Sequence, residues 1–515
     1  SFLLNVQIFQ QSNMKVFCKE KKAKNKIRKL AVIKQLKHNE LLNNCQLPQK
    51  SDNTKFKNFE INELILKALD SMNFIHATDI QAKILPHALN FKDIIASEKT
   101  GSGKTLAYLI PLLNLVLKFR FRNYHGTCAI VLVPTKELCI QVCSIFSQLS
   151  QFCNVKYDMI HSDDINKDQK TKLALGCTVL FCTPGALLQH MKCSLETKEK
   201  ENIEYFRYHN LKFLVLDEAD RLLEDSFKST ISKILNYLPQ KRQTMVLSAT
   251  LDLNSVSIGD ISTLSPSFVS ININLKSGKI LNKNATADNL TEGYVILPSS
   301  KRIIFLYSLV KEIKDRKVMI FFSTSAEVEF YYSFLSLLNI NNNSLLMLHS
   351  DLTSDTRMSN LLSFNNQKSG ILLCTDVVSR GMDIPDVSLI VQFDIPTDFT
   401  TYIHRVGRTA RNGLEGIAIL LLRPGESEKV LSCLSSISKS MIEFETPHLH
   451  EIENFFEHLS PKSELFQTAK KALISQIKAY KNSELIESTD HLKVEDEIVN
   501  FCLKEVPKKL KIKTK

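Results

Sequence analysis

The 515-residue chain contains no tryptophan and only 14 glycines. Its 12 cysteines are scattered, without a C-x-x-C pair or paired histidines, which favours free thiols in a reducing compartment over disulfides or a zinc site. No apolar stretch reaches the roughly 18 residues that a membrane span requires. The opening residues Ser1 to Leu4 lack the basic start and the cleavage site of a secretory signal, and position 1 is not Met. We therefore expect no membrane association.

The formal charge is +12, and lysines are concentrated at both ends of the chain. This balance predicts a polyanionic partner such as a nucleic acid, although solvated charge that only aids solubility stays open for either end. Residues 1–55 contain a basic run from Lys19 to Lys29 with little apolar surface to bury, so we expect a flexible tail there. Nuclear targeting and added RNA affinity are two interpretations of this run, beside a plain solvated extension.

The length predicts two or three domains. In residues 56–265 short apolar runs alternate with helical patterns, and a second block of this kind spans 291–435. This alternation is typical of a parallel sheet covered by helices, so the expected fold class is α/β with two such domains and a cleft between them. Residues 266–290 are expected to be a linker, 436–500 a helical C-terminal extension, and 501–515 a basic tail. The expected strands are 94–96, 129–133, 179–182, 213–216 and 245–247, then 318–322, 344–348, 371–374, 389–392 and 418–422.

A glycine-rich loop spans Lys99 to Thr105, between an expected strand and an expected helix. The residues Thr100, Gly101, Ser102 and Gly103 let backbone N–H groups turn toward a triphosphate, while Lys104 reaches its β/γ-phosphates. The hydroxyl of Thr105 is a ligand for Mg²⁺. The following helix offers its N-terminal amides to the same anion.

Two adjacent carboxylates follow the expected strand 213–216. Asp217 is expected to hold Mg²⁺, and Glu218 to orient and deprotonate an attacking water. After the next strand, the hydroxyls of Ser248 and Thr250 are expected to bond Asp220 and couple the nucleotide site to the domain interface. A surface turn is the alternative for the carboxylates.

Two arginines in the second block, Arg408 and Arg411, lie three residues apart, which puts them on one face if the segment is helical. They are candidates for arginine fingers that stabilise charge on a γ-phosphate. The alternative is an ordinary basic helix face.

The order and spacing of these motifs over residues 59–425 resembles the DEAD-box RNA helicases, a superfamily-2 group built from two RecA-like domains. The resemblance implies an enzyme that uses ATP and Mg²⁺. It implies that Gln81, in a segment that also contains Thr78, reads the adenine edge while Phe59 stacks on the base. Asp383 matches the family's ribose contact.

The same resemblance implies that two sets of residues act on RNA and on the domain interface. The residues implied to grip the RNA sugar-phosphate backbone are Pro134, Thr135, Lys136, Thr183, Gly185, Arg357 and Thr375. Those implied to couple the two domains are Asp220, Ser248, Thr250 and His404. Backbone contacts carry no sequence code, so we expect RNA binding without sequence specificity.

Residues 284–302, the run Lys118 to Phe121 and a helical pattern over 465–480 resemble one nucleolar branch of the family, which includes the Myc-regulated DEAD-box protein. This resemblance implies a role in ribosomal RNA processing and assembly of the large ribosomal subunit. The implied partners are pre-ribosomal RNA and assembly proteins, the implied location is the nucleus and nucleolus, and the implied state is a monomer.

Several positions depart from the family pattern. Most lie in the RNA-gripping motifs, and one, Glu98, places a carboxylate at the opening of the phosphate loop, where it repels a triphosphate unless it turns outward or pairs with Lys99. The others are Lys136 for Arg, Cys139 for Ala, His161-Ser162 for two glycines, Ala186 for Arg, Ser350 for Gly and Ser354 for Gln. Two functions therefore stay open: a helicase that separates RNA strands, and an ATP-gated RNA clamp with weak unwinding. A DNA helicase fits the second-domain motifs less well.

Overall fold

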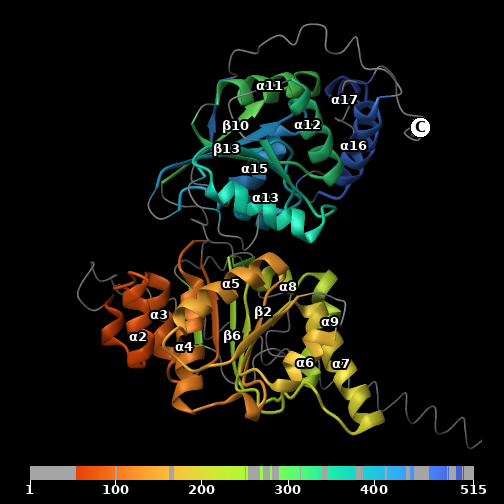
Figure 1. Cartoon of the computed structure of the whole chain (residues 1–515). Coiled ribbons are helices and arrows are strands. Elements are labelled where there is room, and N and C mark those ends of the chain that lie inside the picture. The colour runs from red at the N-terminus through yellow and green to blue at the C-terminus, as the bar shows by residue number, and fades with distance from the viewer. Residues whose placement is uncertain are drawn as a thin grey trace, which may run out of the picture. The chain divides into compact units, whose positions relative to one another are not determined.

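The chain forms two compact units, which divide between Leu281 and Asn282 (Figure 1). The computed structural model describes residues 54–98, 101–161, 167–249, 251–252, 267–270, 279–280, 289–313, 315–338, 345–378, 384, 387–411, 414–435, 441–445, 463–483, 485, 494–501 and 503. The expected basic tails thus fall almost wholly outside the described residues. The predicted site residues Thr100, Thr250 and Asp383 also lie outside them.

The first unit contains a seven-stranded sheet in the order β3-β4-β2-β5-β6-β1-β8, in which all neighbours run parallel. Its strands are β1 (Ile94–Ser97), β2 (Ala129–Leu132), β3 (Tyr157–Ile160), β4 (Val179–Cys182), β5 (Phe213–Leu216), β6 (Gln243–Ser248) and β8 (Ser267–Ser270). Two further strands, β7 (Leu251–Asp252) and β9 (Lys279–Ile280), pair antiparallel. The five strands expected from the apolar runs of this unit are confirmed.

Helices cover both faces of this sheet, as Figure 1 shows. They are η2 (Phe56–Asn58), α2 (Glu63–Ser71), α3 (Asp79–Ala88), α4 (Lys104–Lys118), η3 (Asn123–His125), α5 (Lys136–Leu149), α6 (Lys167–Leu175), α7 (Pro184–Glu201), α8 (Ala219–Leu222) and α9 (Asp225–Tyr237). Alternate residues of β2 belong to different cores: Val131 packs with α4 and α5, whereas Ile130 packs with α7 and α9. Burial on both faces explains why the strands appear in the sequence as continuous apolar runs.

The region expected to be a linker contains a strand of the first sheet. β8 lies inside the expected linker 266–290 and pairs with β1 from Ile94↔Ser267 to Ser97↔Ser270. The first unit therefore extends past residue 265, and the division between the units falls near the middle of the expected linker. A four-residue strand at the edge of a sheet is too short for its periodicity to stand out in the sequence.

The second unit repeats the architecture with a seven-stranded parallel sheet in the order β12-β13-β11-β14-β15-β10-β16. The strands are β10 (Leu290–Ile296), β11 (Lys317–Phe321), β12 (Leu345–Leu348), β13 (Gly370–Cys374), β14 (Leu389–Gln392), β15 (Gly416–Leu422) and β16 (Ile442–Glu443). The helices are α11 (Ser299–Glu312), α12 (Ser325–Leu337), α13 (Ser354–Asn366), α14 (Phe399–Val406) and α15 (Ser427–Leu434). The five strands expected in this block are confirmed.

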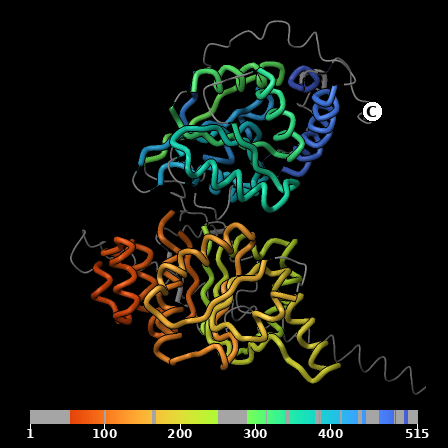
Figure 2. The backbone as a smooth tube through the Cα atoms, viewed as in Figure 1, coloured from red at the N-terminus to blue at the C-terminus, as the bar shows by residue number. Residues whose placement is uncertain are grey.

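The C-terminal region packs onto the second unit through α16 (Glu464–Lys481) and α17 (Val494–Asn500), as the tube in Figure 2 shows. The expected helix over 465–480 is confirmed. Its apolar face, with Ala469, Leu473 and Ile477, belongs to the core of the second unit. The region also supplies a strand, because β16 pairs with β10. It is therefore not purely helical.

Nine cysteines lie in the part of the chain that the structure describes, and all nine are free thiols. Burial raises the pKa of Cys143 to about 11 and that of Cys177 to about 12. Among the described helices, none is long and apolar enough to cross a membrane.

Candidate nucleotide and RNA site

Apart from Phe59, Thr78 and Gln81, which precede β1, the predicted site residues of the first unit lie at or just after the carboxyl ends of five parallel strands. The phosphate loop follows β1, the segment from Pro134 follows β2, Thr183 follows β4 and Asp217 follows β5, while Ser248 is the last residue of β6. Because the strands are parallel, these ends meet at one edge of the sheet, where open α/β sheets bind ligands. Predicted nucleotide residues follow β1 and β5, the predicted coupling residue Ser248 ends β6, and predicted RNA residues follow β2 and β4.

The phosphate loop ends in a left-handed residue that begins α4. Gly103 has a φ of 92° and is the N-cap of the helix. A Cβ atom at this position would lie 2.6 Å from Nε2 of Gln81 and 3.1 Å from Oγ1 of Thr78. Glycine is therefore required twice, by the backbone conformation and by the close approach of α3. Backbone N–H groups at the start of α4 have no intrahelical partner, so this turn suits an anion.

Gln81 holds the phosphate loop against α3. Its Nε2 donates to the carbonyl of Gly103 at 2.9 Å, and its Oε1 accepts from the backbone N–H of Thr78 at 2.9 Å. The side chain is 3% exposed. Phe59, the predicted stacking residue, is half-buried and packs against the hydrophobic core that α3 and α4 share. A glutamine amide has two donors and two lone pairs, so one of each stays available for an adenine edge.

Lys104 lies among the carboxylates of the site. Its Nζ donates to the carbonyl of Glu98 at 2.5 Å. Burial lowers the pKa of the Lys104 ammonium, while Asp217, Glu218 and Asp220 act in the opposite direction. A buried cation that faces several anions is suited to exchange these partners for the oxygens of a polyphosphate.

The carboxylate of Asp217 is positioned by Tyr108, a residue that the sequence interpretation missed. The Tyr108 hydroxyl donates to Oδ2 of Asp217 at 2.8 Å, and the backbone N–H of Glu218 donates to Oδ1 at 2.9 Å. Tyr108 follows Lys104 by four residues, so helical periodicity puts both on one face of α4. That spacing was the signal in the sequence. Burial and the neighbouring Glu218 raise the pKa of Asp217 from 3.8 to about 6.

Glu218 occupies the N-cap of α8 with a φ of 50°. Its side chain is 8% exposed, and among the described residues its Oε2 has no hydrogen-bond partner. Leaving a buried acceptor unsatisfied costs about 1–3 kcal/mol. A carboxylate oxygen held in this position without a hydrogen bond from the described residues is typical of a group that acts on a ligand.

These residues fit a bound metal–nucleotide complex. Asp217 and Glu218 are adjacent, buried and acidic, and burial together with the charge of Glu218 raises the pKa of Asp217 despite Tyr108 and Lys104. Ser102 Oγ also has no hydrogen-bond partner within the described part of the chain. Hard carboxylate and hydroxyl oxygens are the ligands that Mg²⁺ prefers, and Thr105 and Asp217 supply them.

The raised pKa of Asp217 predicts a specific pH dependence of stability. Because the folded protein binds this proton more tightly than the unfolded chain, stability falls as pH rises from 3.8 to about 6, and ionised Asp217 costs about 3 kcal/mol at higher pH. Asp217→Asn is therefore expected to raise the Tm of the nucleotide-free protein by a few degrees at pH 8. Thermal scans from pH 5 to pH 8 measure this, and Asp158→Asn is the matched control. An equal or larger gain at pH 5 would contradict the prediction.

The predicted RNA residues of the first unit begin two helices. Thr135 caps α5 by accepting from the backbone N–H of Leu138 at 3.3 Å, and Pro134 precedes it at the end of β2. Thr183 is the N-cap of α7, with Gly185 in its first turn. Both helix starts lie at the carboxyl edge, and a helix N-terminus attracts phosphate.

The departures from the family pattern differ in their surroundings. Ala186 and Cys139 are fully buried, so neither presents a side chain to the surface. Lys136 and His161 are half-buried, and burial followed by the charge of Lys136 lowers the pKa of His161. Ser162 lies outside the described residues. Glu98 is 4% exposed and therefore does not turn outward to solvent.

In the second unit the carboxyl end of β13 leads into Thr375, whose Oγ1 has no hydrogen-bond partner among described residues. The next residue, Asp376, is clamped by Arg405, whose Nε and Nη2 donate to its two oxygens at 2.6 and 2.9 Å. Arg405 is fully buried and also donates to the carbonyl of Asp394 at 2.7 Å. This clamp, to which the sequence assigned no role, fixes Thr375 relative to the arginine motif.

Arg408 and Arg411 lie in the turns that follow α14, which ends at Val406. Arg408 is 1% exposed and its Nε donates to the carbonyl of His404 at 3.3 Å. The Nε of Arg411 donates to the carbonyl of Gly407 at 2.9 Å. The two arginines therefore do not share a helix face. His404 is buried on α14 itself.

Arg357 lies on α13, and its Nη1 donates to the carbonyl of Ser350 at 3.4 Å. Ser350 replaces a glycine of the family pattern, and its hydroxyl lies 3.2 Å from that of Ser325. His349 is 1% exposed, and burial lowers its pKa. The serine therefore adds local hydrogen bonds beside a predicted RNA contact.

Comparisons with known proteins agree with these observations. The DEAD/DEAH box helicase model matches residues 78–257, and the helicase conserved C-terminal domain model matches residues 301–413. ATP-dependent RNA helicase DDX18 of Homo sapiens is 37% identical over 454 residues, which cover 87% of this chain and 65% of the human protein. The chain thus spans just under two thirds of the length of that relative.

A second relative and a solved structure extend the comparison. ATP-dependent RNA helicase HAS1 of Phaeosphaeria nodorum is 35% identical over 450 residues, 87% of this chain and 71% of that protein. The structure of Mss116p bound to single-stranded RNA and AMP-PNP has a TM-score of 0.74 at 23% identity, over 88% of this chain and 92% of that one. At this identity the structural match establishes the fold. Two parallel-sheet units, the motif sequence Asp217 to Asp220 and these matches show that the chain belongs to the DEAD-box family of ATP-dependent RNA helicases.

Proposed function

We propose that the protein hydrolyses ATP to separate short RNA duplexes or remodel RNA–protein complexes, in ribosomal RNA processing and assembly of the large ribosomal subunit. The observation that carries the proposal is the cluster of Lys104, Asp217 and Glu218 at the carboxyl edge of the first sheet. It combines a buried cation, a poorly neutralised carboxylate and a carboxylate oxygen without a hydrogen-bond partner among the described residues.

In this proposal the residues of the first unit divide the work on ATP. The amides of residues 100–105 and the ammonium of Lys104 bind the triphosphate, and Gln81 and Phe59 hold the adenine. Thr105 and Asp217 hold Mg²⁺, which offsets charge on the phosphates. Glu218 accepts the proton of the attacking water.

Residues of the second unit complete the proposed site. Arg408 and Arg411 stabilise the charge that develops on the γ-phosphate, and Asp383 binds the ribose. His404, Asp220, Ser248 and Thr250 couple nucleotide binding to the relation between the domains. ATP and RNA then favour one closed state because each makes some of its contacts only there.

RNA is the proposed polymer because Thr135, Lys136, Thr183 and Gly185 lie at helix starts beside the nucleotide residues. Thr375 and Arg357 are the proposed contacts of the second unit. The relatives are named ATP-dependent RNA helicases, and the Mss116p structure contains single-stranded RNA and an ATP analogue. Pre-ribosomal RNA, nucleolar assembly proteins and a monomeric state are proposed from the branch resemblance.

The second candidate is an ATP-gated RNA clamp that holds RNA and separates strands weakly. The burial of Ala186 favours it, because no long cationic side chain reaches RNA from that position. Lys136 also keeps its charge without the planar fork of an arginine.

The test measures ATP turnover and release of a short RNA duplex by the full chain, with ATP or AMP-PNP. We expect RNA to stimulate turnover, ATP to support duplex release, and Lys104→Ala to abolish both, whereas Lys67→Ala on the exposed face of α2 leaves both unchanged. ATP-dependent RNA binding without duplex release would replace the helicase by the clamp. Turnover that survives Lys104→Ala would contradict both candidates.

A further inference from the structure

The connection between α4 and β2 forms a cluster of aromatic and basic side chains to which the proposed function assigns no role. We call residues 118–125 the aromatic loop; its sequence is Lys-Phe-Arg-Phe-Arg-Asn-Tyr-His. We propose that this loop is a second RNA-binding surface, which takes an unpaired segment by stacking bases on Phe119 and Tyr124. It acts without ATP and is separate from the nucleotide site.

The aromatic loop lies at the amino ends of the strands, whereas the site described above lies at their carboxyl ends. It leads into the amino end of β2, whereas the phosphate loop leaves the carboxyl end of β1. Both strands belong to the same parallel sheet, so the two loops are separated by the length of the strands. RNA bound here does not compete with the predicted contacts at Thr135 and Thr183.

Aromatic rings form a continuous series along the loop. Phe91, Phe119 and Phe121 follow one another with ring centroids 5.6 and 6.3 Å apart. Phe121 then meets His125 edge-on at 5.9 Å, and His125 lies 4.2 Å from Tyr124. Despite these contacts, Phe119 is 55% exposed and Tyr124 is 65% exposed. Large aromatic rings exposed together mark an interaction surface.

The loop is held firmly, so its rings are presented at low entropic cost. Asn123 Nδ2 donates to the carbonyl of Leu175 at 3.1 Å, and Asn210 Nδ2 donates to the carbonyl of His125 at 2.9 Å. Arg122 Nη1 reaches the carbonyl of Asn154 at 3.1 Å. These bonds tie the loop to the three connections that enter β3, β4 and β5. A preorganised surface loses little conformational freedom on binding.

The charge around the rings is almost entirely positive. Exposed cations beside the rings or in the adjoining connections include Lys92, Lys118, Arg120, Arg122, Lys156 and Arg207. The segments that enter β1, β2 and β3 (89–93, 118–128 and 150–156) contain one carboxylate, Asp93, which is fully buried and accepts from the backbone N–H of Thr244 at 2.7 Å. The segment that enters β5 (202–212) contains one more, Glu204, which is paired with Lys198 and His209. Lys118 Nζ lies 5.0 Å from the centroid of Phe91. The surface therefore favours a polyanion.

Unpaired RNA is the polyanion that uses both features. Cations spaced between aromatic rings match phosphates spaced between bases, and base–aromatic stacking contributes about 1–3 kcal/mol per base regardless of sequence. An acidic polypeptide would use the cations and leave the two exposed rings without a matching partner. Paired RNA would also leave them unused, because its bases are stacked on each other.

The first experiment measures affinity of the full chain, without nucleotide, for a fluorescein-labelled oligouridylate of about 20 nucleotides. We expect the double variant Phe119→Ala/Tyr124→Ala to bind at least about tenfold more weakly. Arg120→Gln/Arg122→Gln is expected to weaken binding and reduce its salt dependence. Tyr237→Ala, which removes an exposed ring from α9, is the matched control. ATP turnover at saturating RNA should be unchanged in all of them.

The second experiment exploits the absence of tryptophan in the chain. Tyr124→Trp introduces a single tryptophan, whose fluorescence a stacked base quenches, and Tyr237→Trp is the control. We expect the oligouridylate to quench only the Trp at 124, even where the basic N-terminal residues add affinity. Because the signal is local, it stands if the alanine variant fails to fold.

Three outcomes would overturn the inference. The first is full affinity of the Phe119→Ala/Tyr124→Ala variant for the oligouridylate, and the second is no quenching of the Trp at position 124. The third is that polyglutamate competes as well as RNA does, while only the arginine changes weaken binding. The last would identify an acidic protein as the occupant. If wild type and the control variants show no RNA-stimulated ATP turnover, that result would instead count against the proposed function and leave the quenching result intact.

Discussion

Glu218→Gln is expected to lower kcat for RNA-stimulated ATP hydrolysis by about 10²–10⁴-fold, because the amide cannot accept the proton of the attacking water. The change keeps the size and shape of a side chain that is 8% exposed and whose Oε2 has no hydrogen-bond partner among described residues. Folding should therefore be preserved. Removing one negative charge beside Asp217 also lowers the repulsion that a triphosphate meets, so nucleotide affinity should stay equal or rise.

Single-turnover hydrolysis separates these effects, since it measures the chemical step after ATP has bound. Equilibrium binding of a fluorescent ATP analogue gives the affinity. Glu199→Gln makes the same chemical change at an exposed position of α7 and should behave as wild type. A loss that appears only as a higher KM would contradict the assignment of Glu218 as general base, because that pattern indicates weaker substrate binding.

The sequence predicted the strands and the loops at their ends better than the contacts that hold the site. All ten expected strands are present, and each appears in the sequence as an apolar run. Eight of them are buried along their whole length, whereas β12 and β15 are partly exposed. The phosphate loop and the carboxylate pair were recognisable because their chemistry requires particular residues at fixed spacing. Since parallel strands bring their carboxyl ends together, their placement at one edge followed from the fold class.

What the sequence did not reveal depends on partners far apart in the chain. Tyr108 bonds Asp217, which lies 109 residues away. Its spacing from Lys104 puts it on the same face of α4, but that local pattern does not identify the distant carboxylate that it bonds. The same holds for Arg405 and Asp376, and for β8, which lies within the expected linker and pairs with β1. The positions of Arg408 and Arg411 depend on where α14 ends, and helix ends are hard to place from sequence.

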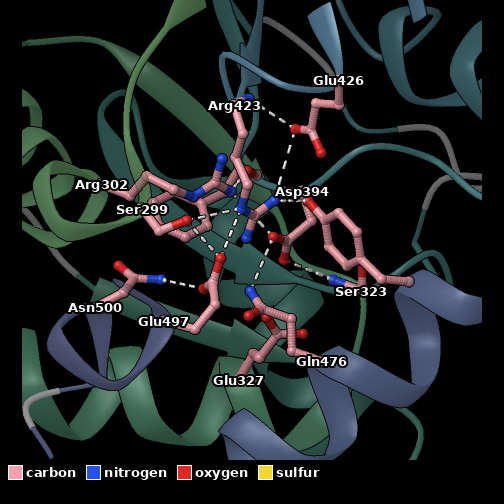
Figure 3. Close-up of polar contacts among 12 residues, drawn as sticks. Ser299, Arg302, Ser323, Glu327, Asp394, Arg423, Glu426, Gln476, Glu497 and Asn500 are labelled. Atoms are coloured by element: carbon pink, nitrogen blue, oxygen red, sulfur yellow. Dashed lines mark hydrogen bonds and ion pairs between the residues drawn. The ribbon is translucent and has the colours of Figure 1, made fainter. Parts of the chain in front are cut away.

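The attachment of the C-terminal helices to the second unit shows this difficulty most clearly. α16 was expected from its apolar spacing, but α17 is joined through buried charges, which Figure 3 shows. Arg423 Nε donates to Glu497 Oε1 at 2.6 Å and to Ser299 Oγ at 2.9 Å. The Tyr480 hydroxyl of α16 accepts from the same guanidinium. One arginine of the second unit thus joins both helices.

The network continues from the C-terminal helices toward the predicted site. Gln476 Nε2 of α16 donates to Asp394 Oδ1 at 3.2 Å, and Arg302 Nη2 donates to the same oxygen at 3.0 Å (Figure 3). Asp394 also accepts, through its carbonyl, the hydrogen bond from Arg405 that accompanies the clamp on Asp376. The helices therefore stabilise the segment that positions the arginine motif.

Glu497→Gln is expected to destabilise the second unit by about 3–5 kcal/mol, because it leaves the guanidinium of Arg423 buried with its main counter-charge removed. Both side chains are almost fully buried, at 0% and 3% exposure. Burial alone would raise the pKa of Glu497, but the charge and hydrogen bond of Arg423, together with Arg302 and Ser299, more than offset it and hold the pKa below its ordinary value. This stabilisation is therefore present above pH 4.5 and is lost as pH falls through the lower, folded-state pKa.

Urea unfolding of the full chain at pH 7.5, followed by far-UV circular dichroism, measures the effect of Glu497→Gln. Glu464→Gln, at an exposed position in the first turn of α16, is the matched control and should cost less than about 1 kcal/mol. Arg423→Met/Glu497→Gln should recover part of the loss, because a buried charge without its partner costs more than an apolar side chain in the same place. If Glu497→Gln unfolds at the same urea concentration as wild type, the ion pair does not anchor α17, and the apolar contacts of Ile498 and Phe501 with the core must hold the helix instead.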